Sequence, residues 1–120
     1  MHLLSLVLAS LGIAAFQPSE LNCRAIYRTL DENQKGSEES VDLKVTFAGA
    51  GATRFEAELQ GKFFSVVEDN SSDLLVQITA APGYTSGTVS KGRLDGQGRY
   101  SLSQVNGVTV HRLECRKAIP

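Results

Sequence analysis

The chain has 120 residues, of which 42% are apolar and 21% are charged, and its formal net charge is −1. This length and composition are typical of one globular domain, with no room for a second core. The near-neutral charge and the 7% of aromatic residues argue against a basic nucleic-acid-binding protein and against an acidic disordered chain. Charge is nevertheless uneven, because residues 31–73 carry ten acidic and four basic side chains, whereas residues 74–120 carry two acidic and six basic ones. This asymmetry either steers an anionic partner to the C-terminal third or reflects two differently charged sheet edges.

The first fifteen residues, "MHLLSLVLASLGIAA", differ from the rest of the chain. They form an apolar run with the length of a signal-peptide core, too short to span a bilayer, although no Lys or Arg precedes it. We expect a secretory signal over residues 1–15 that is cleaved near Ala14 or Ala15; a buried N-terminal helix is the alternative. Residues 16–120 then form a single β domain, secreted or periplasmic, with no membrane insertion after cleavage.

The two cysteines, Cys23 and Cys115, lie near opposite ends of this domain. Neither belongs to a CxxC or Cys/His metal motif, and two thiolates alone do not fill a tetrahedral zinc site. We therefore predict a disulfide between the first and last strands, and neither a metal nor another cofactor. Closing so long a loop stabilises a fold by roughly 4 to 5 kcal/mol in the chain-entropy model.

Alternating apolar and polar residues predict strands along the whole domain. The alternation is strict in "VDLKVTF" and "TRFEAELQ", which cover residues 41–47 and 53–60. Less regular runs predict further strands at residues 21–29, 62–68, 74–80, 84–90, 99–105 and 108–115. The polar segment 31–40 is predicted to be a long solvated loop, or alternatively a lid over a barrel mouth.

About eight short antiparallel strands in sequence predict an all-β fold. We expect a small up-and-down barrel closed by the one disulfide, because closure removes exposed sheet edges and brings the first strand beside the last. A two-sheet β-sandwich is the alternative. An outer-membrane barrel is disfavoured, since the outward positions of the regular strands are charged.

Two glycine-containing turns predict the strand registers in the middle of the chain. A hairpin centred on Gly51 would pair Phe47 with Phe55. A tight turn at residues 60–61 would pair Phe64 with Ala57 and Val66 with Phe55.

The same turn at residues 60–61 leaves Phe63 and Val67 pointing outward. Outward apolar side chains need a cover. That cover is either a nearby loop, or an interface with a second protomer or a partner protein.

The last hairpin carries the remaining candidate residues. Asn106 and Gly107 are typical of a two-residue type I′ turn, which would place Val105 opposite Val108 and Leu102 opposite His111. The inward face would then hold Tyr100, Leu102, His111, Leu113 and Cys115. The outward face would hold an apolar patch of Val105, Val108 and Val110, a second candidate partner surface.

An inward His111 is a candidate ligand-binding residue at a barrel mouth, together with Tyr100 and Leu102. It has no second histidine with which to share a metal, and no serine or cysteine that the sequence places beside it as a nucleophile. The alternative is a histidine hydrogen-bonded within the wall.

No family pattern is met by these residues, so function is inferred from chemistry alone. We expect a non-enzymatic binding module for a small ligand or a protein partner, comparable in kind to small inhibitor proteins. One alternative is a structural envelope protein that self-associates, for example as a homodimer, through Phe63, Val67 and the valine patch. A small hydrolase that uses His111 with a carboxylate is a third hypothesis.

Overall fold

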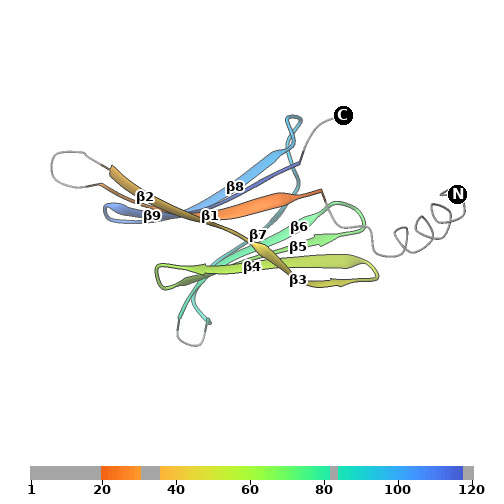
Figure 1. The fold of residues 1–120 in the computed structure, drawn as a ribbon, viewed down its shortest axis with the longest axis horizontal. Helices are drawn as coiled ribbons and strands as arrows, with labels where there is room; N and C mark the ends of the chain where they lie inside the picture. Colours follow the sequence, from red (N-terminus) through yellow and green to blue (C-terminus); the bar gives the residue numbers. More distant parts are fainter. Residues whose placement is uncertain (1–19, 31–35, 82–83, 118–120) are drawn as a thin grey trace, which may run out of the picture.

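The computed structural model describes residues 20–30, 36–81 and 84–117, and the predicted signal segment lies outside them (Figure 1). Within these residues the chain is all-β, as predicted, and forms two antiparallel sheets. The strands are β1 (Asn22–Leu30), β2 (Gly36–Asp42), β3 (Lys44–Gly49), β4 (Ala52–Leu59), β5 (Lys62–Asp69), β6 (Leu74–Ala80), β7 (Gly87–Gly92), β8 (Arg99–Asn106) and β9 (Thr109–Arg116).

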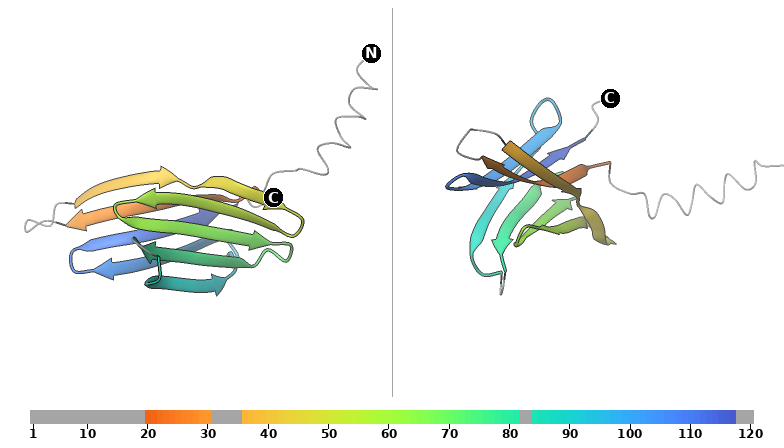
Figure 2. Two further views of the ribbon diagram at one scale, coloured as in Figure 1. Left: turned by 90° about the horizontal axis from the view of Figure 1, so that it is seen from below. Right: turned by 60° about the vertical axis from the view of Figure 1, so that its left-hand side comes forward.

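The two sheets keep the strand order of an up-and-down barrel. One sheet has the order β2-β1-β9-β8 and the other the order β3-β4-β5-β6-β7. Figure 2 shows β2 running on into β3 through a single residue, Leu43, so that one bent strand passes from one layer to the other. In the described part of the chain no ladder joins β7 to β8. The fold is therefore a meander whose first strand pairs with its last, divided into two layers, and this arrangement is compatible with both the predicted barrel and the alternative sandwich.

The prediction of a loop over residues 31–40 is wrong from Gly36 onward, because Gly36–Asp42 is strand β2. Its residues other than Val41 are small or polar and mostly exposed, so residues 36–40 show none of the alternation that marks a strand with one buried face. Pairing with β1 holds this edge strand in place instead.

The predicted single strand over residues 41–47 is bent at Leu43, which is buried. The strict alternation of residues 41–47 predicts that Val45 and Phe47 lie on the buried face of this strand, but both are more than half exposed. A bulge between these two residues changes the register, so that Val45 and not Phe47 lies opposite Phe55. The predicted pairing in the Gly51 hairpin is thus wrong, although the hairpin itself is present.

The next hairpin is confirmed in detail. Phe64 lies opposite Ala57 and Val66 opposite Phe55, as the turn at residues 60–61 predicts. Phe64 and Val66 point into the space between the sheets and are completely buried. The largest fully buried side chains of this core are Phe64, Leu74, Ile78, Leu113, Val66 and Val76.

The terminal hairpin is present with a register that differs from the prediction. Its two turn residues are Gly107 and Val108, and Leu102 lies opposite Leu113 instead of opposite His111. Gly107 has φ 63°, and a glycine in the first central position is typical of a type II′ turn. A shift of two residues leaves every side chain on its predicted face, because side chains alternate with a period of two.

Side chains link the two sheets where the ladder between β7 and β8 is missing. The Tyr100 hydroxyl donates to Ser90 Oγ at 2.8 Å, and Gln104 Nε2 donates to Thr88 Oγ1 at 3.0 Å. These bonds tie β8 to β7 across the open side of the sandwich.

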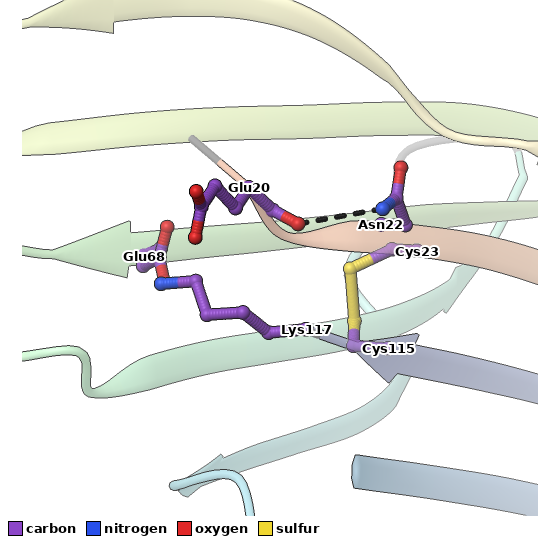
Figure 3. The surroundings of a disulfide bond; sticks show 6 residues. All are labelled: Glu20, Asn22, Cys23, Glu68, Cys115 and Lys117. Atoms are coloured by element: carbon purple, nitrogen blue, oxygen red, sulfur yellow. Dashed lines mark hydrogen bonds and ion pairs between the residues drawn. A yellow bond between two sulfur atoms is a disulfide. The ribbon is translucent and has the colours of Figure 1, made fainter. Parts of the chain in front are cut away.

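The predicted disulfide between Cys23 and Cys115 is present and joins directly opposed residues of β1 and β9 (Figure 3). Beside it, Lys117 Nζ donates to the buried carboxylate of Glu68 at 3.3 Å. The bridge closes one end of the sandwich and is consistent with an oxidising compartment outside the cytoplasm.

Candidate functional site

His111 lies on the inner face of β9 and is only 7% exposed. Its Nε2 donates to the backbone carbonyl of Gln60 at 3.1 Å, and its ring centroid lies 4.8 Å from that of Tyr27. Burial lowers the pKa of His111, and the charge of Lys62 lowers it further, against the opposing effect of the bond to Gln60. His111 is therefore a neutral, hydrogen-bonded residue of the wall.

The other two candidate mouth residues do not converge with His111. Tyr100 lies opposite Cys115, toward the disulfide end, whereas Gln104 lies opposite His111. The Tyr100 hydroxyl donates a hydrogen bond to Ser90 Oγ, and Leu102 packs against the core. Tyr100 and His111 therefore lie at different heights of the sheet, with Leu102 between them in the row of inward side chains.

The two candidate partner surfaces lie on opposite sides of the sandwich. Val105 and Val108 are 68% and 62% exposed on the outer side of the four-stranded sheet, near the tip of its last hairpin. Phe63 and Val67 lie on the outer face of the five-stranded sheet. No single contact surface joins the two groups.

Ion pairs cover much of the outer face of the four-stranded sheet. The Glu114 carboxylate forms ion pairs with Arg112, at 3.1 Å, and with Arg24, at 3.6 Å. Arg28 pairs with Glu38 at 3.3 Å. Charges of opposite sign therefore compensate one another along β1, β2 and β9.

A shallow concavity of about 960 Å³ borders this face near the disulfide. Among its charged residues, Arg99 lies directly opposite Arg116 across the β8–β9 ladder. Backbone N–H groups of Arg99 and Gln97 donate to Asp95 and lower the pKa of its carboxyl group, so the carboxylate remains ionised beside Arg99. Arginines and carboxylates are mixed in this concavity, which weakens its field toward any one class of ion.

The outer face of the five-stranded sheet has a different character. This face holds two small polar residues, Ser65 and Thr79, which are buried although they point away from the core. Large side chains stand around them, namely Phe63, Val67, Leu75, Gln77 and Val89.

A hollow of about 320 Å³ opens on this face, and we call it the Tyr84 hollow. It is lined by Glu58, Phe63, Gln77, Thr79, Tyr84, Thr85, Ser86, Gly87 and Val89. This volume is at the lower end of the range for small-molecule sites.

Backbone hydrogen bonds fix the segment that forms one side of the hollow. Ala80 N donates to Ser86 O at 2.9 Å, and Tyr84 N donates to Ala80 O at 3.1 Å. The Tyr84 ring lies 5.4 Å from the ring of Phe63, so a local segment covers Phe63 in part. Tyr84 has φ 51°, a left-handed conformation that costs a non-glycine residue about 1–2 kcal/mol.

The polar groups of the hollow are only partly satisfied. The Tyr84 hydroxyl donates to Glu58 Oε1 at 3.4 Å, a long bond, and Glu58 has no ion-pair partner among the described residues. Thr79 is 8% exposed, and its buried Oγ1 has no hydrogen-bond partner within the described chain. A buried hydroxyl without a partner is uncommon and calls for an explanation.

The sequence prediction missed most of this site. Residues 84–90 were predicted to form one strand, but β7 begins at Gly87 and Tyr84 lies in the preceding turn. The outward position of Phe63 was the one available signal, since it predicted a cover without identifying the segment that provides it.

Two further features bear on the class of site. In the described ranges, no helix is long and apolar enough to cross a membrane. Within those same residues, no group of three or more His, Cys, Asp or Glu side chains is arranged to hold a metal ion.

In comparisons with known proteins, no family model, no curated protein and no solved structure matches this chain.

Proposed function

We propose that this protein is a non-enzymatic binding module that takes a small ligand, or a side chain of a partner protein, in the Tyr84 hollow. The observation that carries the proposal is the buried, unpartnered hydroxyl of Thr79 in the wall of a hollow with an aromatic rim. A ligand with a polar group would satisfy this hydroxyl, while its apolar part would contact Phe63 and Tyr84.

The proposed location is the periplasm or the extracellular space. The disulfide supports an oxidising compartment, and the apolar segment 1–15 supports export through a signal peptide. The proposal of a binding role without catalysis is supported by His111, which is turned into the wall and bonded to Gln60.

A fragment screen of the purified protein by saturation-transfer NMR tests this proposal. We expect several small polar fragments to bind, and we expect Phe63→Ala to abolish their binding. Phe47→Ala is the matched control, because Phe47 is an exposed phenyl group on the same sheet that does not line the hollow. A screen without hits, or hits that survive Phe63→Ala, would contradict the proposal.

A further inference from the structure

The charge of the Tyr84 hollow points to the chemistry of its ligand. Of the described residues that line it, Glu58 is the only charged one. The next carboxylate along β4 on the same face, Glu56, lies opposite Lys44, whereas Glu58 lies opposite Phe63. Within the described residues, the hollow therefore carries one negative charge that no ion pair compensates.

Two aromatic rings stand next to this carboxylate. The rings of Phe63 and Tyr84 are inclined at 59° to each other, with centroids 5.4 Å apart. The Tyr84 hydroxyl donates to Glu58 Oε1 at 3.4 Å, so the carboxylate lies beside the hydroxyl end of the Tyr84 ring. Aromatic faces attract cations through their quadrupole, and a neighbouring carboxylate adds a direct electrostatic attraction.

The remaining walls offer neutral hydrogen-bonding groups. Gln77, Thr79 and Ser86 line the hollow, and the buried Thr79 hydroxyl has no hydrogen-bond partner within the described chain. Gly87 allows β7 to approach β6 closely here, since a Cβ at this position would lie 2.2 Å from Ile78 O. The result is a small site with one anion, two rings and uncharged acceptors.

We propose that the Tyr84 hollow binds an organic ammonium group. This inference rests on the proposed function and specifies its ligand class. Two sources share this chemistry, namely a quaternary ammonium such as a choline headgroup and the primary ammonium of a lysine side chain. The aromatic pair and Glu58 would attract either kind of ammonium group. Only the primary ammonium has N–H groups that could donate a hydrogen bond to the Thr79 hydroxyl.

The test compares charged and uncharged ligands of matched shape by ¹H–¹⁵N NMR titration. Choline is compared with 3,3-dimethylbutan-1-ol, which has the same shape and no charge. Nα-acetyl-lysinamide is compared with Nα-acetyl-norleucinamide, which lacks the ammonium group. We expect at least one charged ligand to bind about tenfold more tightly than its neutral partner, with shifts at Thr79 and Tyr84. The pair that shows the larger difference identifies the source.

Variants of two glutamates make the test specific. Glu58→Gln should remove the preference for the charged ligand, whereas Glu38→Gln, an exposed carboxylate on the other sheet, should leave the preference unchanged. Equal binding of charged and neutral ligands, or a preference that survives Glu58→Gln, would overturn the ammonium assignment. In that case the proposed binding role still stands if fragments occupy the hollow. If neither the four ligands nor any fragment binds there, both proposals fail.

Discussion

The two outer faces of this sandwich are built from different kinds of side chain. The outer face of the four-stranded sheet carries paired charges, such as Arg112 with Glu114, that partner one another within the molecule. The outer face of the five-stranded sheet instead carries two tilted aromatic rings, a carboxylate and a buried hydroxyl, and neither polar group has an ion pair or a short hydrogen bond within the described residues. Groups that are satisfied within the fold need no ligand, whereas unsatisfied groups at a hollow are what a ligand would complete. The comparison thus supports our proposal that the five-stranded sheet carries the binding face.

Removing the disulfide should have the largest effect on stability and little effect on the binding face. The bridge closes a loop of 92 residues, so the double variant Cys23→Ala, Cys115→Ala should lose about 4.5 kcal/mol of unfolding free energy, measured by urea denaturation. Ligand binding at the Tyr84 hollow should persist in the fraction that remains folded. Loss of binding in that folded fraction would show that the two faces are not independent.

Two neighbouring phenylalanines on β5 should separate the core from the binding face. Phe64→Ala should cost about 4 kcal/mol, because Phe64 is completely buried between the sheets. Phe63→Ala should cost only about 1 kcal/mol, because Phe63 is half-buried on the outer face, yet it should abolish binding in the hollow. Thermal unfolding of both variants measures the two losses of stability. Equal losses would contradict the assignment of Phe64 to the core and Phe63 to the outer face.

Thr79→Val should increase stability by about 1 kcal/mol. The substitution replaces a buried hydroxyl without a partner by a methyl group of similar volume. The same change should weaken ligands that hydrogen-bond to this hydroxyl, which is the trade-off expected of a residue kept for function. Denaturation of the variant measures the gain, and a clear loss of stability would mean that Thr79 has a structural role.

Acid should destabilise the protein through His111, with a smaller effect than the substitutions in the core. Its pKa in the folded state is lowered by burial, so the unfolded chain binds more protons as the pH falls below the ordinary histidine pKa of about 6.5. Its contribution to stability is therefore complete above pH 6.5 and is lost progressively below it. A His111→Gln variant should lack this part of the pH dependence. If wild type and variant have the same pH profile between about 7 and 5, the burial of a neutral His111 is contradicted.

The smallest effect is expected on the ion-paired face. Glu114→Gln removes the shared partner of Arg24 and Arg112, whose side chains are about half exposed. Exposed ion pairs contribute little, so we expect a loss of about 0.5 kcal/mol that shrinks further at high salt. A loss of several kcal/mol would show that this face is not simply solvated surface.

Much of the fold could be predicted from the sequence, because two segments alternate strictly, six others alternate less regularly, and most turns carry glycine. The register of β4 and β5 and the faces of their side chains could be predicted from the apolar positions Phe55 and Ala57 and the turn glycine Gly61. Strand β2 could not be predicted in the same way, since it has no alternation and is held by pairing with β1. The bulge after Val45 likewise leaves no local signal in the sequence.

The site was less accessible to prediction than the fold. His111 attracted attention because histidine is chemically versatile, but the structure turns it into the wall. The hollow depends on Tyr84 lying over Phe63 and on Thr79 remaining without a partner. Both are consequences of packing between segments that are distant in sequence, and alternation patterns do not report such packing.

The most direct test of the binding face is a map of backbone amide shifts in the presence of a ligand that binds. We expect shifts confined to the lining of the hollow, at Thr79, Tyr84 and Val89, with none at Arg24 or Glu114 on the other sheet. Shifts centred on the ion-paired face, with the hollow unchanged, would contradict this account of the molecule.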